Sequence, residues 1–268
     1  MASTWDLGLD RLTKANLQHF VEMMGYDFGP KATKKELLDL VYAGLTKTFF
    51  EKEDGFVRDD LWLQTKFTPL GGQDPNKIPY NPSAPLKVQV KQSIAMSLKN
   101  LGTNRIDSLL LHSPMPTLNE TMEVWSEFEN AVDHGVVRQL GISNCYDPHF
   151  FQMLYESARV KPAVLQNRFY ADTGYDAALR SYCLKHGITY QTFWTLTANP
   201  HILQSAPVGR AAARLRATPA QVLFCWLVQS GHQPLTGTTS PEHMQQDLVA
   251  PQLVLSDAEM REIGALFR

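Results

Sequence analysis

The sequence predicts an α/β protein, a TIM barrel of the (β/α)8 type that is incomplete and is preceded by a helical segment. From Leu61 onward, short apolar runs alternate with longer stretches of helical periodicity. The apolar runs are almost continuous, which is typical of parallel strands that helices cover on both faces. About six such strand–helix units are recognisable, whereas a closed barrel of this type has eight.

Each expected strand is a short apolar run, and each expected helix has apolar residues three or four positions apart. In the first such helix of the barrel, for example, Val90, Ile94 and Leu98 fall on one face. The strands are expected at residues 61–65, 108–111, 139–143, 163–166, 188–193 and 234–237. The helices are expected at residues 88–101, 121–134, 175–186, 207–215, 219–228 and 257–267.

The first part of the chain has a different pattern. Apolar residues recur at i, i+3, i+4 and i+7 from Leu17, and Gly25 ends this amphipathic helix. Thr33 is suited to cap a second helix. We therefore expect residues 1–60 to be a helical segment packed on the barrel, and residues 61–268 to form the barrel itself.

Composition narrows the classes of function. The chain has 268 residues, of which 44% are hydrophobic, and a formal net charge of -2, so it has no positive field for nucleic acid or an anionic membrane. No apolar run reaches the roughly 18 residues of a spanning helix, and the N-terminus lacks a secretory signal. The three cysteines match no metal-ligand spacing, so no metal is expected. A cytoplasmic location follows by elimination.

Residues 68–85 are rich in proline and glycine and predict an irregular loop. The loop follows the strand that ends near Lys66, on the side where barrel enzymes place their active sites. A loop of this length is typical of a lid or a binding loop, and a variable surface insertion is the alternative.

Six short motifs follow one another along the barrel. They are L-Q-T-K-F (63–67), I-D-S-L-L-L-H-S-P (106–114), V-R-Q-L-G-I-S-N (137–144), V-L-Q-N (164–167), Q-T-F-W-T-L (191–196) and L-T-G-T-T-S-P-E-H (235–243). In order and spacing they resemble the motifs of the aldo-keto reductase superfamily of NADP-dependent oxidoreductases. Asp107, at the start of the second motif, is expected on the stability face of the barrel rather than at the active site.

The resemblance implies a set of functional residues. Lys66 and His112 stand at the places of the catalytic lysine and histidine, and both are expected at the same barrel mouth. The residues expected to bind the cofactor are Ser143, Asn144 and Gln166 at the nicotinamide carboxamide, Phe193 stacked on the ring, and Thr238, Thr239, Ser240 and His243 near the adenosine phosphate.

The chain departs from the family pattern at two places. The motif D-T-A-x-x-Y, which carries the family's catalytic Asp and Tyr, is absent upstream of Lys66, where neither Tyr26 nor Tyr42 stands in such a context. A missing strand is the simplest account of this atypical active site. Gly237 and His243 replace the basic residues that hold the 2′-phosphate. NADP(H) is the expected cofactor, and NAD(H) or no cofactor are the alternatives.

Three functions remain open. The first is an NADP(H)-dependent oxidoreductase that acts on a small carbonyl compound, with a loop residue such as Tyr80 as the acid. The second is a redox-inactive relative that uses the mouth for dehydration, cyclisation or isomerisation, or a degenerate pseudoenzyme. The third is DNA binding by residues 12–45, which faintly resemble a SAP-like motif, but residues 1–60 carry eight Lys or Arg against eleven Asp or Glu. A homodimer is a possible cover for the incomplete barrel.

Overall fold

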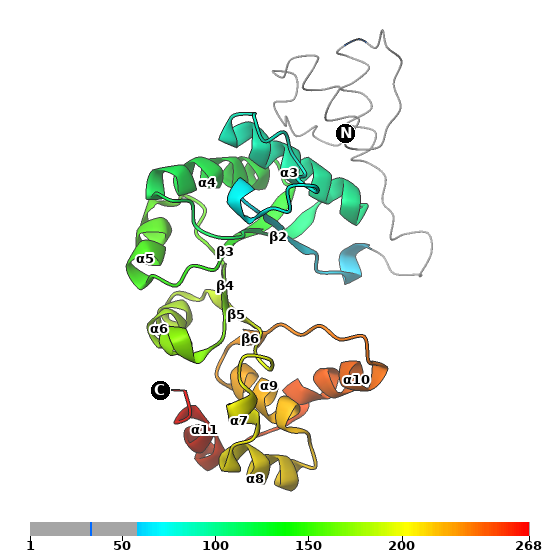
Figure 1. Cartoon of the computed structure of the whole chain (residues 1–268), viewed down its shortest axis with the longest axis vertical. Helices are drawn as coiled ribbons and strands as arrows, with labels where there is room; N and C mark the ends of the chain where they lie inside the picture. Colours follow the sequence, from blue (N-terminus) through cyan, green and yellow to red (C-terminus); the bar gives the residue numbers. More distant parts are fainter. Residues whose placement is uncertain (1–32, 34–57, 268) are drawn as a thin grey trace. The chain divides into compact units, whose positions relative to one another are not determined.

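The computed structural model describes residue 33 and residues 58–267, and it divides into two compact units (Figure 1). The first unit contains the described residues up to Ser143 together with Gln152–Pro162, and the second contains Asn144–Phe151 and the chain from Ala163 onward. The two expected N-terminal helices lie outside the described residues, apart from Thr33.

Three parallel strands and two helices form the centre of the first unit. The strands are β1 (Gln64–Phe67), β2 (Ile106–Leu111) and β3 (Val137–Ser143), which pair in chain order. The helices are α3 (Leu86–Leu101) and α4 (Leu118–Asp133), which pack on one another (Figure 1). Thr117 and Glu120 form a capping box at the start of α4, and Gly102 ends α3 with a left-handed φ of 61°.

The two faces of this sheet differ in character. Leu109 lies level with Thr65 and Leu140, and the Thr65 hydroxyl meets that of Ser97 on α3 at 3.3 Å. This face packs against the helices. Because side chains alternate along a strand, the opposite face carries the residues in between. That opposite face is polar, with Gln64 and Lys66 on β1, Ser108 on β2 and Gln139 on β3.

A buried ion pair joins the start of β1 to the start of β2. The guanidinium of Arg58, in the 3-10 helix η2 (Arg58–Asp60), donates to Asp107 Oδ2 at 2.7 Å. The Leu63 backbone N–H donates to the same oxygen at 2.8 Å. Asp107 therefore lies at the amino end of the sheet, in a structural role, as its place in the sequence indicates.

The second unit also contains three parallel strands. They are β4 (Val164–Arg168), β5 (Thr189–Phe193) and the short β6 (Gln233–Pro234), again in chain order. A 3-10 helix, η4 (Ala171–Asp176), leads into α6 (Ala177–His186). The remaining helices are α7 (Pro200–Leu203), α8 (Ala206–Leu215), α9 (Pro219–Gln229), α10 (Pro241–Val249) and α11 (Asp257–Gly264). Apolar side chains of α8, α9 and α11 form a core with Phe169 and Phe267.

The expected strands are all present, with shifted boundaries. The largest shifts are at β1, which covers Gln64–Phe67 rather than residues 61–65, and at β6, which covers Gln233–Pro234 rather than residues 234–237. Three helices were not expected: α5 (Pro148–Ser157), α7 and α10. Residues 68–85, predicted to be an irregular loop, contain no α-helix or strand, and only a short 3-10 helix at Leu70–Gly72 interrupts them.

Other expectations concern membranes and metals. No helix in the described part of the chain is long and apolar enough to span a bilayer. Within residues 58–267, no group of three His, Cys, Asp or Glu side chains is placed to hold a metal ion. The three cysteines are free and buried.

Candidate active site

Lys66 and His112 project from the same face of the first sheet, at the carboxyl ends of β1 and β2. Lys66 lies level with Leu110, and His112 follows Leu110 by two positions, so both side chains point to the polar face. The His112 backbone N–H donates to the Phe67 carbonyl at 2.9 Å, which extends the strand pairing to the histidine. The sequence placed these two residues together, and the first unit brings them together.

Burial shifts the protonation equilibria of both groups. Removal from water lowers the pKa of Lys66 below its usual 10.5, because desolvation penalises the ammonium. Lys66 forms no ion pair with any carboxylate among the described residues. Burial also lowers the pKa of His112, and the positive charge of Lys66 lowers it further. At neutral pH the pair is therefore a neutral imidazole beside an ammonium.

The Pro-rich loop covers His112. Gly72, in the 3-10 helix η3 (Leu70–Gly72), lies so close that a Cβ atom there would be 3.8 Å from His112 Nδ1. Tyr80 anchors the loop to the end of β1: its hydroxyl donates to the Thr68 carbonyl at 2.8 Å, and its ring packs on Phe67. Burial raises the pKa of Tyr80. A buried, weaker acid whose proton is already donated to a backbone carbonyl is poorly placed to replace the missing tyrosine.

A row of three glutamines crosses the second unit. Gln166 Nε2 donates to Gln191 Oε1 at 2.7 Å, and Gln191 Nε2 donates to Gln233 Oε1 at 3.0 Å. The three residues lie level with one another in the parallel register. Gln166 is the residue expected to hold the nicotinamide carboxamide, so the row orients its amide. Phe193 lies two positions after Gln191, on the same face, and is half-buried.

Asn144 is positioned by a buried network on the other face of β4. Asn167 accepts from the Cys145 backbone N–H at 3.0 Å and donates to the Cys145 carbonyl at 2.8 Å. Asn167 also donates to Asp176 Oδ2 at 2.7 Å, and Tyr190 donates to the same oxygen at 2.8 Å. Cys145 directly follows Asn144, so this network fixes the end of the G-I-S-N motif.

The Asn144 side chain has its own support. The Tyr146 hydroxyl donates to Asn144 Oδ1 at 3.1 Å and accepts from the Arg168 backbone N–H at 3.2 Å. Asn144 itself has a positive φ of 51°, a conformation that asparagine tolerates better than most residues. Ser143 is the last residue of β3, in the first unit. Tyr146 was not expected from the sequence. A tyrosine two residues after the motif was the available signal.

The hydroxyl groups expected at the adenosine phosphate lie at the start of α10. Ser240 caps this helix by accepting from the His243 backbone N–H at 3.3 Å. Thr238 Oγ1 accepts from the Ser240 N–H at 3.1 Å and lies 3.5 Å from His243 Nδ1. Thr239 and His243 are exposed. The structure thus gathers all four residues around one helix start, and no Lys or Arg occurs from residue 235 to residue 249.

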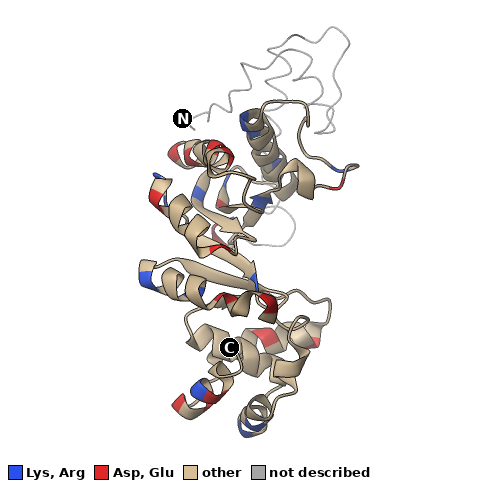
Figure 2. Ribbon diagram, turned by 60° about the vertical axis from the view of Figure 1, so that its left-hand side comes forward, with Lys and Arg blue, Asp and Glu red and all other residues tan. Residues whose placement is uncertain are grey.

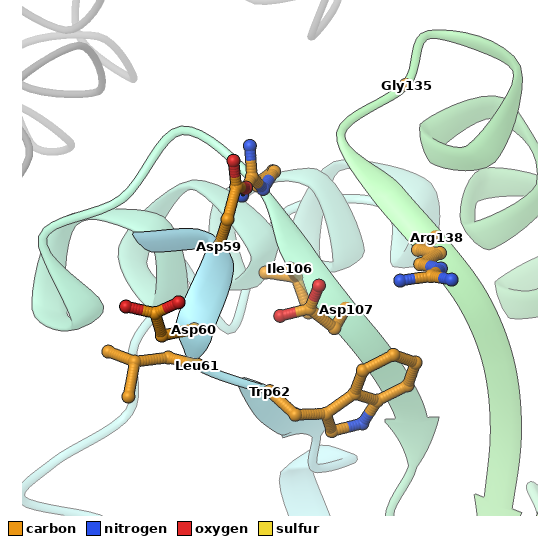
Figure 3. Close-up of a pocket in the computed structure, with 9 residues that line it drawn as sticks. Asp59, Asp60, Leu61, Trp62, Ile106, Asp107, Gly135 and Arg138 are labelled. Carbon is orange, nitrogen blue, oxygen red and sulfur yellow. Dashed lines mark hydrogen bonds and ion pairs between the residues drawn. The ribbon is translucent and has the colours of Figure 1, made fainter. Parts of the chain in front are cut away.

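A cavity of about 310 Å³ lies at the opposite end of the first sheet (Figure 3). Trp62, Asp107 and Arg138 help to line it, and the Arg138 guanidinium stacks 5.0 Å from the centre of the Trp62 ring. Ile106, which lines this cavity, stands six positions before His112, which is roughly 20 Å along a strand. This cavity therefore does not belong to the Lys66–His112 site.

Charged residues are dispersed over the helices. Lys and Arg alternate with Asp and Glu along the chain, without a continuous stretch of either sign on the face shown (Figure 2). Several exposed pairs form, such as Arg210 with Glu262 at 2.6 Å. The described surface has none of the basic stripe that phosphate-backbone binding requires.

Parallel strands covered by helices, with Lys66 and His112 at the carboxyl ends of two of them, place the chain in the class of (β/α)-barrel proteins. Solved structures agree. The chain aligns with an aldo-keto reductase from a Medee basin deep-sea metagenome library with a TM-score of 0.67 and 21% identity, over 81% of this chain and 74% of that one. The silkworm (Bombyx mori) aldo-keto reductase complexed with NADPH matches with a TM-score of 0.64 and 19% identity, over 78% and 65% of the two chains.

The family model of the aldo/keto reductases matches residues 44–268. The chain therefore belongs to the aldo/keto reductase family, and the match begins before the expected Leu61. It is similar to 2,5-diketo-D-gluconic acid reductase B of Corynebacterium, with 28% identity over 68% of this chain and 65% of the relative. It is also 28% identical to an NAD/NADP-dependent indole-3-acetaldehyde reductase of Schizosaccharomyces pombe, over 66% and 64% of the two chains. The matched segments thus span just under two thirds of these curated relatives.

Proposed function

We propose that this protein is an oxidoreductase that reduces a small carbonyl compound with NADP(H) or NAD(H). The observation that carries the proposal is the Lys66–His112 pair, on one face at the carboxyl ends of adjacent strands, in a member of this family. The amide row that ends in Gln166, with Asn144 and Phe193, supplies suitable partners for a carboxamide and a planar ring.

The two residues divide the chemistry at the carbonyl oxygen. The nicotinamide, when bound, supplies a hydride to the carbonyl carbon. His112 is neutral at pH 7 because its pKa is lowered, so its imidazole N–H donates a hydrogen bond to the oxygen. The Lys66 ammonium stabilises the negative charge that develops there and gives up a proton to form the alcohol. Its lowered pKa makes it a better acid than an ordinary lysine. This assignment replaces Tyr80 as the acid.

The cofactor segment around α10 supports weak discrimination between the two dinucleotides. The hydroxyls of Thr238, Thr239 and Ser240 are neutral donors, and His243 is the only basic side chain among residues 235–249. Asp247 accepts a hydrogen bond from Thr236 at 2.7 Å, which leaves a carboxylate near this segment. A 2′-phosphate prefers a guanidinium or ammonium partner, so NADPH gains little here over NADH.

The test is oxidation of NADPH and NADH at 340 nm with a panel of aldehydes and ketones. We expect turnover by the wild type and by Lys87→Gln, a matched exposed lysine on α3. Lys66→Gln is expected to lower kcat by about 10²- to 10⁴-fold, the usual contribution of a general acid. Lys66→Arg keeps the charge but does not release a proton, so it lowers kcat while leaving KM nearly unchanged. If no carbonyl is reduced and neither dinucleotide changes the melting temperature, the proposal is contradicted. The result then favours the redox-inactive alternative, which carries out dehydration, cyclisation or isomerisation.

A homodimer as one cover for the incomplete barrel and the expected cytoplasmic location remain part of this proposal. Sedimentation of the full chain distinguishes a monomer from a dimer. The free, buried thiols of Cys145, Cys183 and Cys225 support a reducing compartment.

A further inference from the structure

The side chain of Arg168 contacts two aromatic rings at the carboxyl end of β4. Its guanidinium carbon is 4.1 Å from the centre of the Trp194 ring and 5.1 Å from the centre of the Tyr170 ring. Stacking of this kind fixes the plane of a guanidinium and leaves its N–H groups pointing outward along the edge.

No described residue neutralises this guanidinium. Arg168 Nε is buried and has no hydrogen-bond partner, and no carboxylate within residues 58–267 forms an ion pair with the side chain. Asp172 lies on the same cavity but does not pair with it. A buried donor without an acceptor is costly, so natural structures keep one mainly where a ligand or another group completes it.

The guanidinium opens into a cavity of about 490 Å³, which is large enough for a substituted aromatic acid or a phosphate ester. The cavity is lined by Arg168, Tyr170, Asp172, Trp194, Thr197 and Ala198. Trp194 is 57% exposed and has a φ of 57°, a backbone conformation that bulky residues seldom adopt. An exposed indole held in this way is typical of a ligand-binding surface.

The cavity lies near the residue expected to hold the nicotinamide. Arg168 follows Gln166 by two positions in β4, on the same face and about 7 Å further along the strand. Both residues belong to the second unit. A ligand held at Gln166 therefore has part of its length within reach of Arg168.

We propose that Arg168, Trp194 and Tyr170 form an oxyanion-binding subsite. The guanidinium edge donates two parallel hydrogen bonds to a carboxylate or a phosphate, and the two rings hold its plane. Two sources have this chemistry: the diphosphate of a dinucleotide, and the carboxylate of an acidic carbonyl substrate. Only the choice between these sources rests on the proposed function. The oxyanion subsite itself does not require turnover.

Arg138, near the amino end of β3 in the first unit, provides a matched control. It also stacks on an exposed tryptophan, Trp62, at 5.0 Å. Its side chain is exposed, however, and no buried donor of Arg138 lacks a partner. Arg138→Gln therefore removes a similar cation–aromatic contact without removing the subsite.

The experiment is a fluorescence titration with inorganic pyrophosphate, 4-carboxybenzaldehyde and benzaldehyde, repeated by calorimetry. The proposal expects pyrophosphate, 4-carboxybenzaldehyde or both to bind the wild type and Arg138→Gln. It expects Arg168→Gln to weaken that binding by about tenfold or more, as loss of a charge-assisted pair does. Arg168→Lys, which keeps the charge but loses the fork, should be intermediate. Trp194→Phe should lose the fluorescence signal but retain heat of binding. Benzaldehyde should bind Arg168→Gln and the wild type alike.

The outcomes separate the two proposals and the two sources. Pyrophosphate binding that NADH displaces assigns the subsite to the cofactor, and selective binding of 4-carboxybenzaldehyde assigns it to the substrate. Either result supports the subsite, even if no carbonyl is reduced. The subsite is refuted if neither anion binds the wild type, or if Arg168→Gln and Arg168→Lys, with unchanged melting temperatures, bind the anions as the wild type does.

Discussion

Replacing Arg58 by methionine is expected to lower the free energy of unfolding of the first unit. The Arg58 guanidinium donates to the Leu61 and Arg105 carbonyls at 2.7 and 2.9 Å, and to the Thr103 hydroxyl at 2.9 Å. It also pairs with Asp107, and the two side chains are only 5% and 10% exposed. The substitution therefore removes four hydrogen bonds and leaves the buried Asp107 carboxylate with the Leu63 N–H but without its counter-charge.

The size of the effect follows from the burial of the pair. Removing one member of a buried ion pair costs about 3 to 5 kcal/mol, because the other charge stays buried. In a chain of this size that corresponds to a fall in melting temperature of roughly 6 to 20 °C. An exposed pair costs about 0 to 1 kcal/mol, and Arg105 with Asp59 is such a pair. Arg105→Gln is therefore the control.

Thermal and urea unfolding, followed by circular dichroism, measure these differences. The double variant Arg58→Met with Asp107→Leu should be more stable than Arg58→Met alone, because it also removes the uncompensated charge. A loss below 1 kcal/mol for Arg58→Met, similar to that of Arg105→Gln, would refute the reasoning.

Four further predictions follow from the site and its surroundings. Tyr80→Phe should keep kcat within about threefold, since its hydroxyl donates to Thr68 and is not the acid; a kcat loss of 10²-fold or more would restore it as the acid. The kcat of the wild type should fall as pH rises through the lowered pKa of Lys66, below 10.5, because the ammonium is the acid; a flat profile to that pH argues against it. Burial, and then the charge of Arg180, lower the pKa of His232 to about 4. The neutral histidine therefore contributes its full stability above the unfolded pKa near 6.5. About 3 kcal/mol of the free energy of unfolding is lost as pH falls from there through about 4. Acid melts of His232→Phe should lack this loss, and an unchanged pH dependence contradicts it. Gly237→Lys should raise the preference for NADPH over NADH about tenfold, because it adds a cation for the 2′-phosphate. A Cβ atom at Gly237 would meet no atom within 4 Å, so the side chain has room. An unchanged ratio of the two dinucleotide affinities would place the 2′-phosphate elsewhere.

The strands and the Lys–His pair were predictable because both depend on local pattern. Near-continuous apolar runs mark buried parallel strands, and a residue at a strand end has its position fixed by the register. Lys66 and His112 needed only the alternation of β1 and β2 to share a face. The boundaries of β1 and β6 were placed less well, and the two residues of β6 carry little periodic signal.

The supporting shell was not predictable, because it depends on contacts between distant residues. Asp176 meets Asn167 and Tyr190 only after η4 turns back on β4, through left-handed conformations at Gly174 and Tyr175. Burial raises the pKa of Asp176 despite these hydrogen bonds. Arg168 stood beside the V-L-Q-N motif, as a charged residue at a buried strand end. Its stacking on Trp194 required a backbone conformation that no local pattern indicates.

The glutamine row has a direction as well as a position. Each amide donates its NH2 group to the oxygen of the next, from Gln166 through Gln191 to Gln233. Turning one amide alone would set two oxygens, or two NH2 groups, against each other, so all three can only reverse together. A molecule that contacts Gln166 thus meets the first of three coupled dipoles. The last, Gln233, is exposed to water, and its hydration helps to set whether the buried end offers a donor or an acceptor.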